Sequence, residues 1–350
     1  MKAERGFELG KSLELLRTSG EELLYDGSGR AARSAPYLRD GLSLQRYMSM
    51  PVLAALPAAL GGIYLFGWRT LVVIAVSYLF GGLVQVGFSL VRRRPFSEGL
   101  LVTGLLYALL LPPLVPLWLV ALGIIIAMLS RELFGGLGQN IFNPALVGKA
   151  FLLLIVPTIM AAHWAAPYWG GWGGLLHYMP QKLPALTPLL AAAANQAPPL
   201  WQLFVGNVPG ALGTTSGLLM LLGGGLLLVT RTIDWRISLV MIVTVGLLEG
   251  LLGMMGLPGQ FGVGGWATQL LAGSLLFAAF FNATDPVTSP FTRRGRWLYG
   301  ILTAVLVVLL RGLTGAPEGV TFSILIANAF VPLLDRWTLP QSFAAREEGA

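Results

Sequence analysis

The segment LVVIAVSYLFGGLVQVGFSL, residues 71–90, carries no charged side chain over its whole length. About 20 apolar residues suffice for a helix to cross the hydrocarbon core of a bilayer, so this segment is typical of a transmembrane span. Residues 237–252 and 297–310 are strongly apolar stretches that approach this length. The chain is 55% hydrophobic and 11% charged, with a mean hydropathy of +0.73, whereas a soluble domain carries about 25% charged residues. The sequence therefore predicts an all-α polytopic membrane protein.

Composition also excludes several classes of site. The chain has no cysteine, so it forms no disulfides, thiolate metal sites or cysteine-held iron–sulfur clusters of its own. Its two histidines, His163 and His177, lie far apart, and we expect no metal site. The first 46 residues are too charged for a cleaved signal peptide. The net charge of +7 comes from basic residues between the apolar segments, so we expect no nucleic-acid partner.

Ten apolar segments follow one another along the chain. They are residues 50–67, 71–90, 99–111, 116–130, 144–161, 215–229, 237–252, 266–281, 297–310 and 320–334. When Lys and Arg are counted in alternate connections, 20 fall on one side and only Arg69, Lys182 and Arg311 on the other. Because cytoplasmic connections are enriched in Lys and Arg, both termini are predicted in the cytoplasm, which requires an even number of spans.

The two halves of the chain resemble each other. Residues 100–113 (LLVTGLLYALLLPP) are similar to residues 270–281 (LLAGSLLFAAFF), and each is the third apolar segment of its half. Because five spans is an odd number, such repeats lie in the membrane with opposite orientations, and binding sites form where they meet. The alternative is that helices rich in Leu and Ala resemble one another through composition alone.

The chain is thus expected to have five parts. They are a cytoplasmic amphipathic segment at residues 1–48, a first five-helix repeat at 49–161, an outer loop at 162–211, a second five-helix repeat at 212–335 and a cytoplasmic tail at 336–350.

A polar motif, FFNATDPVTSP at residues 280–290, ends the eighth apolar segment. Placing polar side chains at the end of a membrane span costs free energy, so Thr284 and Asp285 are candidates for lining a cavity or an ion pathway. An ordinary turn that leads into a cytoplasmic loop is the competing explanation.

A second motif, FGGLGQNIFNPALVGKAF at residues 134–151, carries Asn140 and Asn143 just before an apolar helix. Asn is a favoured N-cap and Pro suits the first helical position. A helix N-terminus inside a membrane can bind a phosphate or a cofactor carbonyl, and an ordinary surface cap is the alternative. Nearby Glu132 is a candidate for an ion pathway, although its position beside Arg131 favours a surface ion pair.

A third motif, GNVPGALGTTS at residues 206–216, opens the sixth segment. Gly213 permits close backbone approach, and the hydroxyls of Thr214, Thr215 and Ser216 can bind a ring or a ribityl chain, or simply cap a helix. The connection before it contains Trp164, Tyr168, Trp169, Trp172, Tyr178 and Trp201. These aromatic residues are either interfacial anchors or a flat lining for a flavin or quinone ring.

The three motifs resemble those of one protein family. Further matches to the same family follow in the same order along the chain: Trp235-Arg236-Ile237, Leu298-Tyr299-Gly300, Pro317-Glu318-Gly319, Asn328 and Asp335. It is the membrane flavin subunit shared by Na+-translocating NADH:quinone reductase, where it is called NqrB, and the Rnf complex, where it is called RnfD. Residues 35–40 are similar to the reductase protein and residues 135–140 to the Rnf version, and the resemblance begins near residue 35. It implies ten helices in two inverted five-helix repeats, related to urea and ammonium channels. It also implies FMN esterified through its phosphate to an outer-loop threonine and, in the reductase branch, a bound riboflavin.

In that family the modified threonine ends a Ser-Gly-Ala-Thr sequence, with an Asp six residues earlier. The best match is residues 184–189 (PALTPL), in which Thr187 is kept and Gln181 replaces the Asp. Gln cannot bind Mg2+ as a carboxylate does. Covalent and non-covalent binding of FMN therefore both remain open at Thr187, for which we expect an exposed loop position.

The resemblance implies a membrane subunit of a cation-translocating, flavin-dependent oxidoreductase complex of the NADH:quinone reductase or Rnf ferredoxin:NAD type. We expect Na+ or H+ as the ion, the bacterial inner membrane as the location, and membrane lipids, the other subunits and an outer-side flavoprotein as partners. Electrons would leave to quinone or to a low-potential carrier. The alternative function is a channel or transporter for a small solute or ion on the related fold.

The charge distribution gives a direct test of topology. A reporter fused after Arg94, Arg231 or Arg296 should read as cytoplasmic, because these residues belong to the basic connections. A reporter inserted near Tyr178 should read as external. Paired alkaline phosphatase and green fluorescent protein fusions measure both, and an external signal at Arg296 would rule out the ten-span topology.

Overall fold

The computed structural model describes residues 44–92, 99–180, 185–256, 261–314 and 318–339. Within these residues the chain forms fourteen α-helices, one 3-10 helix and one π-helix, and no strand. The ten apolar segments expected from the sequence each fall on one of these helices or on a run of adjacent ones.

The first half of the chain is built from six helices. They are α2 (Leu44–Phe66), α3 (Arg69–Arg92), α4 (Gly99–Leu109), α5 (Leu117–Leu133), α6 (Pro144–Ile155) and α7 (Pro157–Ala162). The fifth apolar segment is split between α6 and α7 at Pro157, which has no N–H to continue the helix.

A connecting region and the second half follow. The connection holds η1 (Gly173–Leu176), α8 (Pro188–Ala193) and α9 (Leu200–Val205). The second half consists of α10 (Gly217–Val229), α11 (Trp235–Met254), α12 (Trp266–Leu271), α13 (Leu275–Phe277), η2 (Ala278–Asn282), α14 (Arg293–Thr314) and α15 (Gly319–Thr338).

The eighth apolar segment is broken, whereas the sequence pattern predicts one continuous helix. The break lies between α12 and α13 at Gly273, whose φ of +70° favours glycine. The Arg311 guanidinium donates to the carbonyls of Gln269 at 2.7 Å and Ala272 at 3.2 Å. A buried cation thus satisfies backbone groups that the interrupted helix leaves unpaired.

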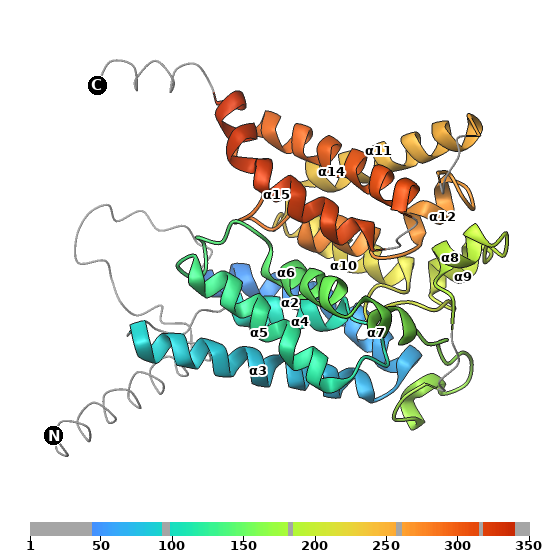
Figure 1. The fold of residues 1–350 in the computed structure, drawn as a ribbon, viewed down its shortest axis with the longest axis horizontal. Coiled ribbons are helices and arrows are strands. Elements are labelled where there is room, and N and C mark those ends of the chain that lie inside the picture. The colour runs from blue at the N-terminus through green and yellow to red at the C-terminus, as the bar shows by residue number, and fades with distance from the viewer. Residues whose placement is uncertain (1–43, 93–98, 181–184, 257–260, 315–317, 340–350) are drawn as a thin grey trace.

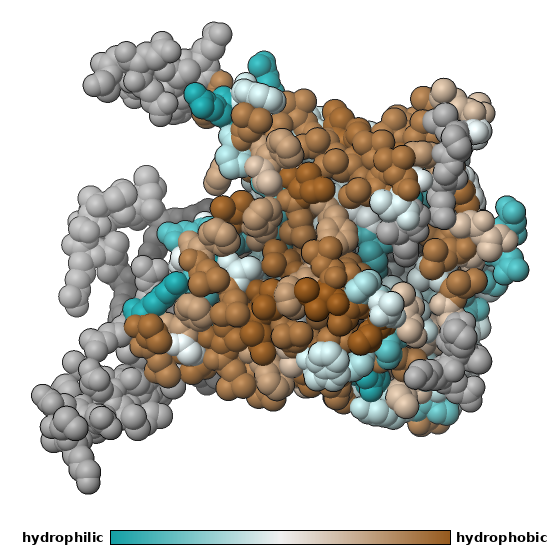
Figure 2. All heavy atoms as spheres, viewed as in Figure 1, coloured by the Kyte–Doolittle hydropathy of each residue, from teal (hydrophilic) through white to brown (hydrophobic). Residues whose placement is uncertain are grey.

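The surface of α3 is arranged for lipid rather than for water. Its buried face consists of small or polar residues, including Ser77, Gly81 and Gln85, while Leu79 and Leu83 on the opposite face are more than half exposed. Small residues at helix contacts and large apolar residues outside are typical of membrane helices. Figure 2 shows hydrophobic residues over the middle of the visible face and hydrophilic ones mostly towards its edges.

Five of the described helices are long and apolar enough to cross a membrane. Their candidate spans are Tyr47–Phe66, Arg69–Arg92, Trp235–Met254, Arg293–Thr314 and Gly319–Thr338. Helices α4, α6 and α10 are apolar but shorter.

The two halves lie one above the other in Figure 1 and repeat the same packing pattern. In the first half α3 packs against α4 and α5, and α5 packs against α6; in the second half α11 packs against α12 and α14, and α14 packs against α15. The halves meet through α2 with α10 and through α6 with α15.

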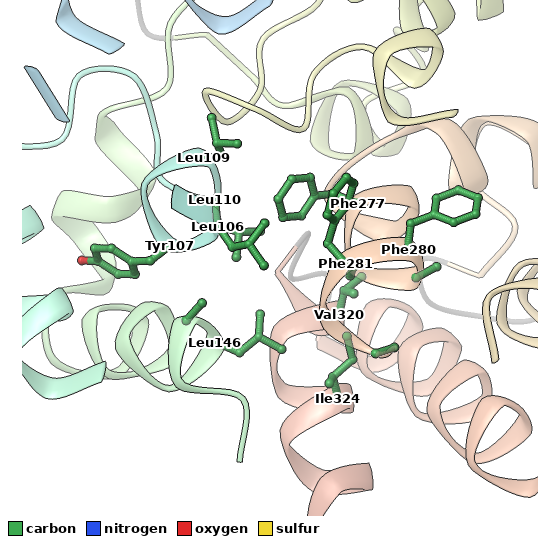
Figure 3. Close-up of a cluster of buried hydrophobic side chains, with 14 of the residues drawn as sticks. Leu106, Tyr107, Leu109, Leu110, Leu146, Phe277, Phe280, Phe281, Val320 and Ile324 are labelled. Atoms are coloured by element: carbon green, nitrogen blue, oxygen red, sulfur yellow. The ribbon is translucent and has the colours of Figure 1, made fainter. Parts of the chain in front are cut away.

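The core between the halves is apolar (Figure 3). Leu106 of α4 and Leu110 just after it face Phe277 and Phe281 across the interface, and the two phenyl rings stack with centroids 4.8 Å apart. Val320 of α15 belongs to the same core. The short third segments of both halves therefore form the centre of the molecule.

Three basic residues that the charge count assigned to connections are buried inside helices. Arg131 and Lys149 are no more than 1% exposed, and Arg311 is 3% exposed. Without these three residues, 18 Lys and Arg residues fall on the predicted cytoplasmic side and 2 on the other side, so the charge asymmetry is kept. Lys149 of α6 pairs with Glu318, which precedes α15, and this ion pair joins the two halves.

Loss of one partner of the Lys149–Glu318 pair should destabilise the protein strongly. Glu318→Gln leaves a buried ammonium without its carboxylate, which costs about 3–5 kcal/mol. The double variant Lys149→Met/Glu318→Gln removes both charges and should recover much of that loss. Thermal unfolding in detergent measures the difference, with the exposed Arg293→Gln as a control that should change little. A double variant less stable than Glu318→Gln would contradict the pairing.

Candidate functional site

Two cavities lie between the halves, and they gather most of the predicted site residues. The Asp285 cavity is lined by Asn140, Asn143, Thr284 and Asp285 and has about 700 Å³ of space that atoms do not fill. The Thr187 cavity is lined by Thr187, Thr214 and Thr215 and has about 460 Å³.

Asn143 connects the two halves at the Asp285 cavity. Its Oδ1 atom accepts from the N–H groups of Ala145 at 3.1 Å and Leu146 at 3.4 Å, which caps α6. Its Nδ2 atom donates to the Asn282 carbonyl at 3.3 Å and to Asp285 Oδ2 at 3.4 Å. One side chain of the first half therefore orders the polar motif that ends the third segment of the second half.

Asp285 is held by a local turn. Its Oδ1 atom accepts from the Val287 N–H at 3.1 Å, while the Thr284 hydroxyl donates to the Phe280 carbonyl. Burial raises the pKa of the Asp285 carboxyl from 3.8 to about 6, although the Val287 N–H opposes the shift. Asp285 can therefore change its charge close to neutral pH.

Two buried polar atoms in the Asp285 cavity lack hydrogen-bond partners among the described residues. They are Asn140 Oδ1, an acceptor, and Arg131 Nη1, a donor. Buried polar groups in native proteins are normally paired, so unpaired ones that line a cavity indicate where a ligand can bind. The remaining wall is largely apolar and includes Phe280 and Phe281.

Glu132 does not form the surface ion pair that its position favoured. It is 8% exposed and Arg131 is 1% exposed, so the pair is buried. Glu132 Oε1 lies 3.0 Å from Arg131 Nη2, and Glu132 Oε2 lies 3.8 Å from Arg92 Nη1. Glu132 lines neither cavity.

Thr187 is buried, contrary to the exposed loop position expected from the sequence. It is 5% exposed and precedes α8 without capping it, and its hydroxyl has no partner among the described residues. Lys149 and Glu318 line the same cavity, as does Ser274. Gln181 and Pro184, where the sequence departs from the family motif, lie outside the described residues.

Gly213 and Ser216 lie beside the Thr187 cavity but do not line it. The Gly213 N–H donates to the Leu109 carbonyl at 2.8 Å, and a Cβ atom there would lie 2.5 Å from the Leu109 Cβ. Ser216 caps α10 by accepting from the Leu219 N–H. The close approach of Leu109 explains why residue 213 is a glycine, and capping of α10 explains why residue 216 is a serine.

Most aromatic residues of the connection between the halves face outwards. Trp172 is 73% exposed, Trp201 is 55% exposed and Tyr178 is 51% exposed, as expected for interfacial anchors. Trp164 lines the Thr187 cavity.

Sequence reasoning missed three buried charged residues, Lys149, Glu249 and Arg311, and the partly buried Glu318. Glu249 of α11 accepts from the Gly262 N–H at 2.7 Å, and it is 1% exposed. For Lys149 and Glu249 the available signal was a charged residue inside an apolar segment, which in a membrane protein points to a functional or structural partner. Arg311 and Glu318 lie just outside their segments and gave no such signal.

Comparisons with known proteins agree on one family. The sequence model of the family described as NQR2, RnfD, RnfE matches residues 31–344. The chain is 33% identical to the NqrB subunit of the Na(+)-translocating NADH-quinone reductase of Ectopseudomonas mendocina, over 99% of this chain and 97% of that protein. It is 36% identical to the RnfD subunit of the proton-translocating ferredoxin:NAD(+) oxidoreductase complex of Clostridium ljungdahlii, over 89% and 96% respectively.

The raised pKa of Asp285 predicts a pH-dependent stability. Its value in the unfolded chain is near 3.8 and in the fold about 6, so the folded state binds the proton more tightly. The contribution of this group to stability therefore falls as the pH rises from about 4 to about 6 and stays low above that. Melting temperatures at pH 4.5 and pH 7 should differ more for the wild type than for Asp285→Asn, and equal differences would contradict the assignment.

Proposed function

We propose a function from one premise: this chain belongs to the NQR2, RnfD, RnfE family. It is the flavin-carrying membrane subunit of a cation-translocating electron-transfer complex in the bacterial inner membrane. The observation that carries this proposal is the pair of cavities between the halves, which together collect seven of the residues that the family motifs single out.

The proposed topology has ten spans in two inverted five-helix repeats, with both termini in the cytoplasm. The matching packing of α3, α4, α5 and α6 with that of α11, α12, α14 and α15 supports a repeat. Five spans in each half reverse the orientation of the second copy. The asymmetry of basic residues supports the cytoplasmic termini.

In this proposal the Asp285 cavity holds a non-covalent flavin such as riboflavin. The edge of a flavin ring alternates carbonyl acceptors with an N–H donor. Among the lining residues, Arg131 Nη1 offers a donor, while Asn140 Oδ1 and Asp285 offer acceptors. Phe280 and Phe281 supply apolar contacts for the ring and exclude water. When bound, the flavin supplies reversible electron transfer, and the protein orients it and tunes its potential.

The Thr187 cavity holds FMN in the same proposal. The unpaired Thr187 hydroxyl is the attachment atom for the phosphate, and the hydroxyls of Thr214 and Thr215 lie along the same wall. Lys149 supplies a positive charge against the phosphate, with Glu318 balancing it when the cavity holds no anion. A buried cation next to a hydroxyl suits a negatively charged phosphate ester better than it suits a neutral solute.

The coupling ion is Na+ or H+, and the names of the relatives cover both. Asp285 and Glu132 are the proposed carboxylates of the ion pathway, since both are at least partly buried and accept from neighbouring donors. The partners are the other subunits, including a flavoprotein on the outer side, and membrane lipids. Electrons leave to quinone in the reductase type or to a low-potential carrier in the Rnf type.

Mass spectrometry of the intact protein tests the flavin proposal. The chain is expressed with its native partners and should carry an added mass of one FMN minus water, which disappears in Thr187→Val. Thr215→Val is the matched control, because Thr215 lines the same cavity but donates its hydroxyl to the Ala211 carbonyl at 2.6 Å. It should keep the added mass.

Two other outcomes are informative. An unmodified mass with a yellow colour that is released on denaturation would keep the flavin function and discard the covalent site. An unmodified and colourless protein within an intact complex would overturn the proposed function and leave a channel on the same fold.

A further inference from the structure

Arg131 presents one of its donors to the Asp285 cavity. The residue is 1% exposed, lines this cavity, and has no partner for Nη1 among the described residues. Its other donors are used: Nη2 and Nε bond Glu132 Oε1 at 3.0 and 3.3 Å, and Nη2 also lies 3.4 Å from Gln85 Oε1. A fully buried guanidinium with one free donor at a cavity wall is built to meet an acceptor there.

The surroundings of Arg131 fix this orientation. A Cβ atom at Gly99, the first residue of α4, would lie 2.7 Å from Nη1, so the absence of a side chain there leaves room for the guanidinium. The carboxylate of Glu132 is shared with Arg92, which lies 3.8 Å from its other oxygen. Because Glu132 is divided between two arginines, it does not cancel the charge that Arg131 brings to the cavity.

We propose that Arg131 is the cationic donor for a carbonyl of the redox ring in the Asp285 cavity, and that it stabilises the reduced form of that ring. The inference rests on the proposed function, because it assumes a flavin there. Reduction places more negative charge on the carbonyl edge of the ring, so a positive charge beside it favours the reduced state and raises the midpoint potential. Arg131 is thus a positioning and tuning residue of the binding site.

A purely structural role for Arg131 is the competing explanation, since it also ties α5 to α3 through Gln85. Arg311 provides the matched control. It is similarly buried in the last turn of α14, and its Nη1 and Nη2 atoms donate to the backbone carbonyls of Gln269 and Ala272. Its Nε atom also lacks a partner among the described residues, but Arg311 lines neither cavity, so that donor is not offered to a ligand there. A structural role predicts similar consequences for both arginines, whereas a tuning role separates them.

The test uses the full chain with Thr187→Val, so that covalent FMN does not contribute, and riboflavin as the probe. Fluorescence titration gives the dissociation constant and spectroelectrochemical titration gives the midpoint potential. Arg131→Gln should bind riboflavin about tenfold more weakly. The ratio of its affinity for reduced riboflavin to its affinity for oxidised riboflavin should fall at least tenfold. A tenfold fall lowers the midpoint potential of this two-electron couple by about 30 mV. Arg131→Lys keeps the positive charge and should lower the midpoint potential much less than Arg131→Gln does, and Arg311→Gln should leave the midpoint potential unchanged.

A second variant tests the same contact without removing the arginine. Gly99→Ala pushes against Nη1 and should weaken riboflavin binding several-fold, while Gly87→Ala on α3, where a Cβ atom meets nothing within 4 Å, should not. The inference is overturned if riboflavin binds to Arg131→Gln and Gly99→Ala with unchanged affinity and potential. A wild-type chain that binds neither riboflavin nor FMN would instead overturn the proposed function itself.

Discussion

Hydrocarbon offers no hydrogen bonds, so every helix end that lies among the apolar helices must find its partner inside the protein. The structure meets this constraint with a few side chains. Asn143 caps α6 and Ser216 caps α10. Arg311 takes up the carbonyls at the break after α12, and Arg69 takes up those of Pro113 and Val115 before α5. The break in the third segment of the second half is therefore stabilised by a specific polar residue that lies beside it.

The same constraint places the cavities. Helices α6 and α10 are short, and the residues just before them line the cavities: Asn140 and Asn143 before α6, and Thr214 and Thr215 before α10. A side chain that satisfies the backbone can also order the polar residues around a cavity: Asn143 caps α6 with Oδ1 and donates from Nδ2 to Asp285. A cofactor bound there would meet groups that are already ordered by the fold, which reduces the cost of orienting it.

Hydropathy was sufficient to predict where the helices lie, because an apolar segment of this length has few alternatives to a helix in lipid. It did not predict the break at Gly273, since the residues on both sides remain apolar and the partner, Arg311, is about 40 residues away in sequence. Lys149 was also counted as a loop residue, because its partner Glu318 lies even further away in sequence. The motifs placed Asn143 and Asp285 beside helix ends, and in the structure both residues line one cavity. Burial of Thr187 depends on how the connection packs, which local sequence does not specify.

The two buried arginines illustrate how similar halves can acquire different roles. Arg131 and Arg311 each lie in the last turn of the helix that follows the third segment of their half. In the second half the third segment is broken, and Arg311 gives two of its nitrogens to the freed carbonyls. In the first half α4 is unbroken, so it leaves no freed carbonyls for an arginine to bond. Arg131 instead pairs with the Glu132 carboxylate and lines a cavity. Asymmetry in the backbone, rather than a change of residue type, thus decides which arginine holds the fold together and which one is left to meet a ligand.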